Sequence, residues 1–358
     1  MKEKIKVLVV GCGNMGKSHA RAYHKMDEFD IVGLVSRGAE SRNALSEELG
    51  GYPTFDNYDT ALSEAKPDAV SINTYPDTHF EYVMKGLDAE CHVFVEKPLA
   101  NTVAQCEQIK AKAIEKEKKI VIGYILRVHP TWTQFIEHAQ TLGKPLVMRM
   151  NLNQQSHGET WCVHKNLMKS MSPIVDCGVH YVDIMSLMTK AKPVSVSAIG
   201  AKLSDEIDND MYNYGQLQVR FDDGSVGWYE AGWGPMMSET AYFIKDVIGP
   251  KGCVSIVDKN PDKDGVSSDN VDNHTGTNTL VLHYSKTDDQ GNFIKQDKRI
   301  DTTDEPDHDG LCFLEQAYFL KAIQEDIDLT QHMDDAINSL RIVLAADESA
   351  KTETTVRL

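Results

Sequence analysis

A lysine and a histidine–aspartate pair have the types and spacing that acid–base chemistry requires. Lys97 stands at the end of an expected buried strand, and Pro98 restricts its backbone to an extended conformation. An ammonium placed there can donate to a substrate hydroxyl; the alternative is a lysine that reaches along the sheet edge to solvent. Asp176 and His180 are four residues apart on an expected helix, so their side chains share one face.

The pairing of Asp176 with His180 suits removal of a proton from an alcohol. A histidine titrates near neutral pH and serves as a base, and a carboxylate orients the ring and stabilises its cation. A lone histidine on a helix is more often structural, but the aspartate one turn earlier favours catalysis. Ser172 and Pro173 are expected to cap and begin this helix, with Asp183 on the same face.

A glycine-rich turn near the start of the chain has the spacing of a dinucleotide-binding site. Ile5–Val10 is an apolar, β-branched run, and G-x-G-x-x-G follows it before a helical pattern to about Met26. Gly11 allows a tight turn, Gly13 lets the backbone approach a pyrophosphate, and Gly16 lets helix and strand pack closely. The N–H groups at the helix start would face the phosphates. A merely structural glycine turn is the alternative.

The residues after the second expected strand, Phe29–Ser36, predict the cofactor preference. An NAD site usually carries an Asp or Glu about twenty residues beyond the glycines, which accepts from the ribose 2′-OH. This chain has Ser36 and Arg37 there, a hydroxyl and a guanidinium suited to a 2′-phosphate. The sequence therefore favours NADP(H), with NAD(H) as the alternative, and a solvated surface arginine is the structural explanation.

Two secondary-structure patterns divide the chain. Strands alternate with helices over residues 1–126, which predicts an α/β dinucleotide-binding domain of the Rossmann type with a parallel sheet. Strands dominate residues 127–358, which predicts an α+β substrate-binding and oligomerisation domain with a large, mostly antiparallel open sheet. An Asp-Asp-Gly turn between Tyr214–Phe221 and Ser225–Gly232 predicts a hairpin there.

Ligands of a parallel sheet lie beyond the carboxyl ends of its strands, so the residues after each strand are further candidates. Thr74, Tyr75 and Pro76 follow the strand Asp68–Asn73, and His79 begins the next helix. Pro76 stiffens this turn, which we expect beside the nicotinamide end of a bound cofactor. A plain helix-capping turn is the alternative.

The motifs GCGNMG, TYPDTH, VFVEKP and GYILRVHP together resemble those of the Gfo/Idh/MocA family of NAD(P)-dependent sugar and polyol dehydrogenases. The family pattern is G-x-G-x-x-G, T-P-x-x-x-H, E-K-P and G-F-x-x-R-F-x-P, followed by D-x-G-x-H, here residues 176–180. Tyr75 departs from it where the family often has a smaller residue, and His129 stands at a commonly acidic position. The resemblance implies Lys97, Asp176 and His180 as the catalytic set.

The candidate binding residues follow from the motifs and the resemblance together. Those expected at the cofactor are Gly11, Gly13, Asn14, Met15, Gly16, Ser36, Arg37, Thr74, Tyr75, Pro76, His79, Glu96 and Lys97. Those expected at the substrate are Lys97, Arg127, Trp161, Asp176 and His180. His157, Trp161 and His164 are expected in a loop, either lining a sugar pocket with aromatic faces or as ordinary loop residues.

Composition narrows the class of protein. A formal net charge of -17 argues against a general nucleic-acid or anionic-membrane surface. The seven cysteines are scattered without metal-site spacing, so we expect reduced thiols, no metal and a cytoplasmic protein. No apolar run approaches the length of a membrane span. The open sheet predicts a homodimer or homotetramer.

These observations predict an oxidoreductase that transfers a hydride between a secondary alcohol of a sugar, inositol or related polyol and NAD(P). Lys97 would hold the reacting oxygen, His180 would exchange its proton, and Asp176 would orient His180. One alternative is an NAD-dependent glycosidase that acts by transient oxidation and elimination. Another is a non-catalytic dinucleotide or sugar sensor, which would be expected to lack one of these three groups.

Overall fold

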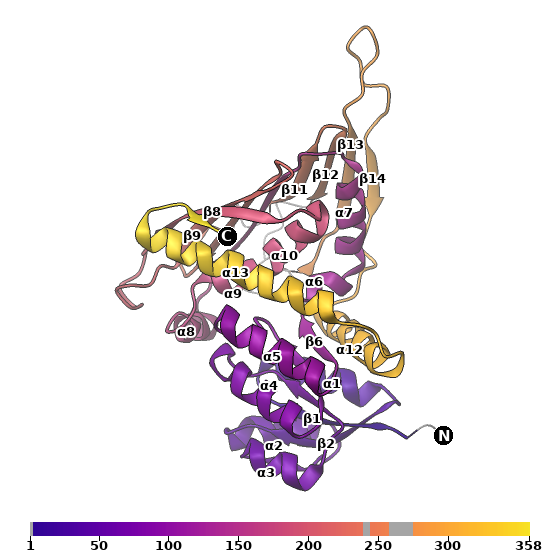
Figure 1. Ribbon diagram of the computed structural model, residues 1–358, viewed down its shortest axis with the longest axis vertical. Helices are drawn as coiled ribbons and strands as arrows, with labels where there is room; N and C mark the ends of the chain where they lie inside the picture. The colour runs from indigo at the N-terminus through magenta and orange to yellow at the C-terminus, as the bar shows by residue number, and fades with distance from the viewer. Residues whose placement is uncertain (1–2, 239–243, 258–274) are drawn as a thin grey trace. The chain divides into compact units, whose positions relative to one another are not determined.

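The computed structural model describes residues 3–238, 244–257 and 275–358 (Figure 1). The loop expected over Asp258–Asn278 lies mostly outside these residues, as does the start of the strand expected over Tyr242–Ile248. Two compact units are present: residues 1–125 with 308–337, and residues 126–307 with 338–358. The expected division at residue 126 treats the domains as consecutive, whereas His308–Ile337 returns to the first unit. The functional division of the chain stays a prediction.

The first unit contains a six-stranded parallel sheet, as predicted. Its strands lie in the order β3-β2-β1-β4-β5-β6. They are β1 (Ile5–Val10), β2 (Phe29–Val35), β3 (Thr54–Phe55), β4 (Ala69–Ile72), β5 (His92–Glu96) and β6 (Ile120–Gly123). The strand order reverses direction between β1 and β4, which is the switch point where such sheets bind ligands. The first four residues that follow β1 are Gly11, Cys12, Gly13 and Asn14.

Seven helical segments accompany this sheet among the described residues. They are α1 (Asn14–Lys25), α2 (Ala39–Glu48), α3 (Tyr58–Ala65), the 3₁₀ turn η1 (Pro76–Thr78), α4 (His79–Asp88), α5 (Val103–Glu115) and α12 (His308–Gln324). Residues 53–65 were assigned no element from sequence; there Asn57 caps α3 by accepting from the Thr60 N–H at 3.0 Å.

Helix α12 belongs to the core of the first unit although it comes almost 300 residues after α1. Figure 1 shows α12 beside α1, and the two helices pack together. The Phe319 ring lies 6.5 Å from that of Phe29 and 6.2 Å from that of Phe94, and all three are buried. Burial of this apolar surface stabilises the return of the chain to the first sheet.

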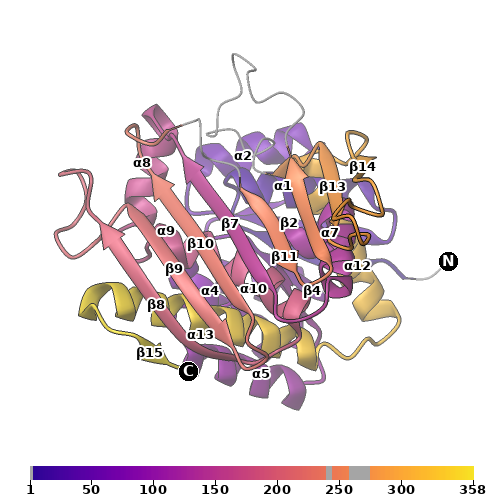
Figure 2. The same ribbon diagram turned by 90° about the horizontal axis from the view of Figure 1, so that it is seen from above.

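The second unit contains a nine-stranded sheet that is mostly antiparallel, as predicted. The strands lie in the order β14-β13-β12-β11-β7-β10-β9-β8-β15 (Figure 2), and among the described strands β7 and β10 are the one pair of neighbours that runs parallel. They are β7 (Val147–Gln154), β8 (Pro193–Ala201), β9 (Tyr214–Phe221), β10 (Val226–Trp233), β11 (Lys245–Gly249), β12 (Gly252–Val257), β13 (Thr279–Tyr284), β14 (Lys298–Asp301) and β15 (Val356–Arg357). The predicted hairpin joins β9 to β10, with Gly224 at φ +83° in its turn.

The helices of this unit bring two corrections to the sequence-based assignment. They are α6 (Ile125–Val128), α7 (Pro130–Thr141), α8 (Gly158–Leu167), α9 (Pro173–Asp176), α10 (Gly178–Thr189) and α13 (Thr330–Thr352), with α6 and α13 beginning in the first unit. Trp161 and His164 lie on α8 rather than in a loop. The single helix expected from Pro173 to about Met188 is two segments that meet at Cys177.

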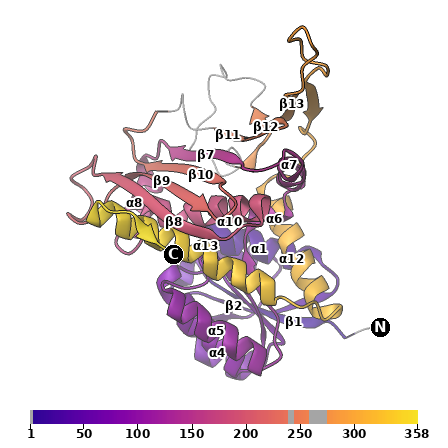
Figure 3. The ribbon, with the colours of Figure 1, turned by 45° about the horizontal axis from the view of Figure 1, so that its top comes forward.

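Helix α10 packs on β10 (Figure 3), which places His180 and Asp183 over the sheet of the second unit. The expected cap of the preceding segment is confirmed, because the Val175 N–H donates to Ser172 Oγ at 3.2 Å. In the part of the chain that the structure describes, no helix is both long and apolar enough to cross a membrane.

Candidate functional site

The glycine turn after β1 is shaped by close backbone contacts. Gly11 has φ +94°, and a Cβ there would lie 2.5 Å from the carbonyl oxygen of Asn73. A Cβ on Gly16 would lie 1.8 Å from the carbonyl oxygen of Gly11, far inside contact distance. A Cβ on Gly13 would meet no atom within 4 Å. Gly11 and Gly16 are therefore required by packing, whereas Gly13 borders open space.

The start of helix α1 is suited to an anion. Gly13 is its N-cap, no side chain caps the helix, and its first turn contains no acidic residue. The first N–H groups of a helix have no intrahelical partner and carry partial positive charge. Gly13 and Asn14 are exposed at this end, so these groups can reach a phosphate.

The end of β2 carries a second cation that the sequence motif did not reveal. Arg37 is exposed, as expected for a residue that could meet a 2′-phosphate. Arg42, on α2, donates to the carbonyl oxygens of Ser36 at 2.8 Å and Arg37 at 3.2 Å. Its Nε is buried without a hydrogen-bond partner among the described residues. The available sequence signal was the position of Arg42 one turn into α2. A side chain at this position can reach back to the end of β2.

His79 is a buried connection between two turns at the carboxyl ends of β4 and β5. Its Nδ1 lies 2.7 Å from the carbonyl oxygen of Pro98, and its Nε2 lies 3.0 Å from that of Thr74. Burial lowers the pKa of this imidazole. Tyr75, in contrast, is 48% exposed. The contacts of His79 thus hold the loops beside Tyr75 and Lys97, and its expected place at the cofactor stays a prediction.

Glu96 turns its carboxylate into the first unit while Lys97 is half-buried at the strand end. Glu96 Oε1 lies 2.8 Å from His19 Nε2, and Oε2 accepts from the Lys97 N–H at 3.2 Å. A Cβ on Gly123 would lie 3.2 Å from the Glu96 carboxyl carbon, so this glycine leaves room for the carboxylate. His19 was not singled out from sequence, because one histidine on an amphipathic helix carries no signal by itself.

In the second unit, Asp176 ends α9 and His180 lies in the first turn of α10. Asp176 is buried and His180 is half-buried. Cys177, between them, keeps helical dihedral angles, and its Sγ lies 3.5 Å from Asp176 Oδ2. A Cβ on Gly178 would lie 3.3 Å from both Tyr229 and Val343. This close packing explains a glycine inside an otherwise helical stretch.

Asp183 does not join Asp176 and His180 as the shared helix face suggested. Its Oδ2 accepts from Arg127 Nε at 2.7 Å and its Oδ1 from Arg127 Nη2 at 2.6 Å. The Ser339 hydroxyl also donates to Oδ1, at 3.3 Å. Since Asp183 is 1% exposed, this is a buried ion pair. The role expected for Arg127 at the substrate stays a prediction beside this structural one.

Aromatic groups gather near Cys177, and sequence reasoning found only part of them. The His164 ring stacks on Trp233 with centroids 4.3 Å apart. Trp233 Nε1 donates to Gln154 Oε1 at 2.7 Å, and that oxygen lies 3.9 Å from Cys177 Sγ. Trp161 donates instead to Glu206 at 3.3 Å. Trp233 and Gln154, at the ends of two adjacent strands, carried no motif, because only strand pairing brings them together.

His129 has a structural role. It caps α7 by accepting from the Thr131 N–H at 3.2 Å, and its Nε2 lies 3.0 Å from the Thr275 carbonyl oxygen. Burial lowers its pKa. These contacts engage both ring nitrogens of His129, at a position where the family often has an acidic residue.

Comparison with known proteins identifies the family. The model for an oxidoreductase family with an NAD-binding Rossmann fold, Gfo/Idh/MocA, matches residues 5–124. The model for the C-terminal domain of the same family matches residues 135–253. The chain belongs to the Gfo/Idh/MocA family.

Relatives of this Gfo/Idh/MocA protein are only moderately similar. It is 30% identical over 201 residues to UDP-N-acetylglucosamine 3-dehydrogenase of Acidithiobacillus ferrooxidans, which covers 56% of this chain and 59% of that protein. It is 25% identical over 271 residues to the scyllo-inositol 2-dehydrogenase (NAD(+)) of Bacillus subtilis, 72% of this chain and 75% of that protein. This chain thus spans less than two thirds of the length of the first relative and three quarters of the length of the second.

The fold itself is shared over the whole chain. The structure of apo scyllo-inositol dehydrogenase from Lactobacillus casei aligns with a TM-score of 0.77 over 100% of this chain and 99% of that chain, at 21% identity. Within this fold, Lys97 belongs to the first unit, and Asp176 and His180 belong to the second.

Proposed function

We propose that this Gfo/Idh/MocA protein is an NAD(P)-dependent dehydrogenase that acts on a secondary alcohol of a sugar, inositol or related polyol. The observation that carries the proposal is the open space at Gly13, beside an α1 N-terminus with neither a capping side chain nor an acidic first turn. The relatives named above, a nucleotide-sugar 3-dehydrogenase and an inositol 2-dehydrogenase, support this class of substrate.

The residues present fit a dinucleotide. Gly11 and Gly16 hold the turn, and the backbone of Gly13, Asn14 and Met15 would donate to the pyrophosphate. The exposed guanidinium of Arg37 favours a 2′-phosphate, so NADP(H) is the proposed cofactor. Bound nicotinamide supplies the hydride acceptor or donor, and the protein supplies binding and orientation.

In the proposed mechanism, protein groups manage the substrate's oxygen and its proton. Lys97 donates a hydrogen bond to the reacting hydroxyl and stabilises negative charge on its oxygen. His180 accepts the hydroxyl proton during oxidation and returns it during reduction. Asp176 orients His180 and stabilises the imidazolium.

The same proposal includes a homodimer or homotetramer assembled through the sheet of the second unit. A hollow of about 900 Å³ lies on this sheet, lined among others by Val147, Arg220 and Trp228. Val147 is 39% exposed there. Light scattering coupled to gel filtration would measure the subunit number, and a monomer at micromolar concentration would contradict this part.

The direct test is the absorbance of reduced nicotinamide with NAD⁺ and NADP⁺ in parallel, across inositols, aldoses and sugar acids. The proposal expects growth of the signal with one substrate class and a preference for NADP⁺. Absence of signal from every pair, despite measured cofactor binding, would overturn the dehydrogenase assignment. A chromogenic glycoside would then separate a glycosidase from a non-catalytic sensor.

A further inference from the structure

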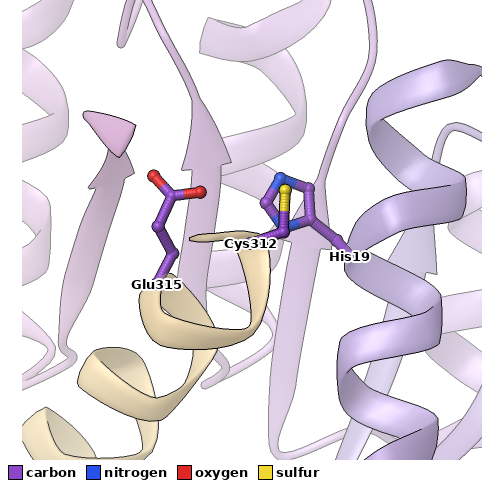
Figure 4. Close-up of side chains that lie close together, drawn as sticks. All are labelled: His19, Cys312 and Glu315. Carbon is purple, nitrogen blue, oxygen red and sulfur yellow. The ribbon is translucent and has the colours of Figure 1, made fainter. Parts of the chain in front are cut away.

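Three potential metal ligands come together inside the first unit. His19 lies on α1, and Cys312 and Glu315 lie three residues apart on one face of α12 (Figure 4). One ligand atom from each residue lies within 4.8 Å of those of the other two. All three are buried, with exposed fractions of 0%, 0% and 3%. The fold therefore brings a nitrogen, a sulfur and a carboxylate into one enclosed space.

Glu315 is the member of this cluster that most needs a partner. Neither carboxylate oxygen has a hydrogen-bond partner among the described residues. Burying a carboxyl group without a partner is costly, and a buried charge is normally paired or bound to a metal. A cation at this position would offset the cost of burying the carboxylate.

We propose that His19, Cys312 and Glu315 bind one divalent transition-metal ion of the zinc class. Imidazole, thiolate and carboxylate are the ligands that zinc takes in proteins, in tetrahedral sites that three protein groups and one further ligand complete. A thiolate and a carboxylate neutralise the two positive charges, so the ion and its three protein ligands together carry no net charge. This suits a buried site.

The surroundings of His19 resemble the outer shell of a metal site. Its Nε2 lies 2.8 Å from Glu96 Oε1, and Gln316 Nε2 lies 2.8 Å from its Nδ1. Gln316 is itself held by the Tyr23 hydroxyl at 2.5 Å. Such partners fix the ring plane of a ligating histidine. When one ring nitrogen of His19 binds the ion, its present contact is lost. The contact of the other nitrogen, with Glu96 or Gln316, still orients the ring.

A metal ion here would tie α12 to α1. No sequence pattern predicts this site, because almost 300 residues separate Cys312 and Glu315 from His19 and no cysteine pair marks it. Loading would release the protons of the thiol and the carboxyl, so affinity is expected to rise with pH. It would also raise the thermal stability of the protein, because the ion binds the folded chain and not the unfolded one.

The test uses the full-length protein purified without a metal-affinity column. Elemental analysis after equilibration with Zn²⁺ and dialysis should give one equivalent per chain. Co²⁺ should produce a thiolate charge-transfer band, which Cys312→Ser removes, and Glu315→Gln should weaken Zn²⁺ binding at least tenfold. Cys91→Ser is the matched control, because Cys91 is buried in the same unit and its Sγ lies 3.2 Å from the Pro67 carbonyl oxygen.

Failure of the wild-type protein to bind one equivalent of either ion would overturn the proposal. A charge-transfer band that persists in Cys312→Ser, or is lost in Cys91→Ser, would do the same. The wild-type spectrum decides even if Glu315→Gln does not fold. Since the readouts are metal content and absorbance of the ion, they are independent of turnover and of the proposed dehydrogenase activity.

Discussion

The glycine turn of the first unit and the α9–α10 segment of the second show how differently two candidate sites can be built. In the turn, backbone atoms form the site, and Gly11 and Gly16 are dictated by carbonyl oxygens within 2.5 Å of the position of a Cβ. In the segment, side chains form the site on a helix that packs on β10. The glycines of the turn are close together in sequence, although the carbonyl oxygen that restricts Gly11 comes from Asn73. The side chains of the segment depend on partners distant in sequence.

This difference explains why the prediction that groups Asp183 with Asp176 and His180, on a shared helix face, was wrong. Spacing alone groups Asp176, His180 and Asp183, but the Arg127 guanidinium and the Ser339 hydroxyl take Asp183 into a buried pair. Backbone sites are thus predictable from local sequence, whereas side-chain sites require knowledge of the neighbours. Changes in each region can test this contrast.

The largest effect is expected at His180. Replacement His180→Ala should lower kcat by about 10²–10⁴-fold, the usual contribution of a general base, while cofactor binding persists. The matched control is His24→Ala, since His24 is an exposed residue near the end of α1 without a proposed catalytic or binding role. Steady-state kinetics and cofactor titration measure both. A kcat within a few-fold of wild type for His180→Ala would assign this histidine to structure.

Arg127→Met should destabilise the protein by about 3–5 kcal/mol, because it leaves the Asp183 carboxylate buried without its partner. The control is Arg149→Met, which breaks the exposed pair with Asp246 and should cost less than about 1 kcal/mol. Urea unfolding measures both changes. If Arg127→Met leaves the free energy of unfolding unchanged but raises KM, Arg127 binds substrate and its pairing with Asp183 does not contribute to stability.

The two glycines of the turn should respond differently to the same added methyl group. Gly16→Ala should lower the melting temperature and abolish cofactor binding, because its Cβ would overlap the Gly11 carbonyl oxygen. Gly13→Ala should fold normally, since its Cβ meets no protein atom, yet bind the dinucleotide more weakly. Calorimetry and cofactor titration distinguish these outcomes. Equal melting temperatures for the two variants would contradict the packing argument.

Arg37→Ala should weaken NADP⁺ binding about tenfold, the value of one charge-assisted hydrogen bond, and leave NAD⁺ nearly unchanged. NAD⁺ serves as the internal control because it lacks the 2′-phosphate. Arg42→Ala tests whether the second guanidinium contributes in the same way. An equal loss for both cofactors would remove the support for an NADP(H) preference.

A pH-dependent effect is expected at Lys245, whose Nζ donates to the Asn151 carbonyl oxygen and lies 5.3 Å from the centroid of the Tyr181 ring. Burial lowers the pKa of Lys245 from 10.5 to about 7. Between these values the unfolded chain binds more protons than the folded one, so stability from this residue rises with pH and is lost as pH falls toward 7. Lys245→Met should flatten this part of the melting-temperature profile.

The control for that profile is Lys251→Met, which replaces an exposed lysine a few residues further along the chain. It should leave the pH dependence unchanged. A wild-type profile without any rise between pH 7 and pH 10 would show that Lys245 is solvated in the folded protein.

The sequence by itself determined the parallel sheet, the glycine turn and the residues that follow each strand. These depend on periodicity and on backbone geometry over a few residues, as in the run from Ile5 to Gly16. The cap at Ser172 and the β9–β10 hairpin were predictable for the same reason, and the structure contains both. Local interactions need no knowledge of the rest of the chain.

Only the tertiary structure decided which side chains meet. Helix α8 forms where a loop was expected, Asp183 pairs with Arg127, and α12 returns to the first unit to place Cys312 and Glu315 beside His19. The return of α12 is accompanied by burial of surfaces far apart in sequence, Phe319 against Phe29 and Phe94. Side-chain spacing on one element cannot reveal them, because the partner is supplied by another element.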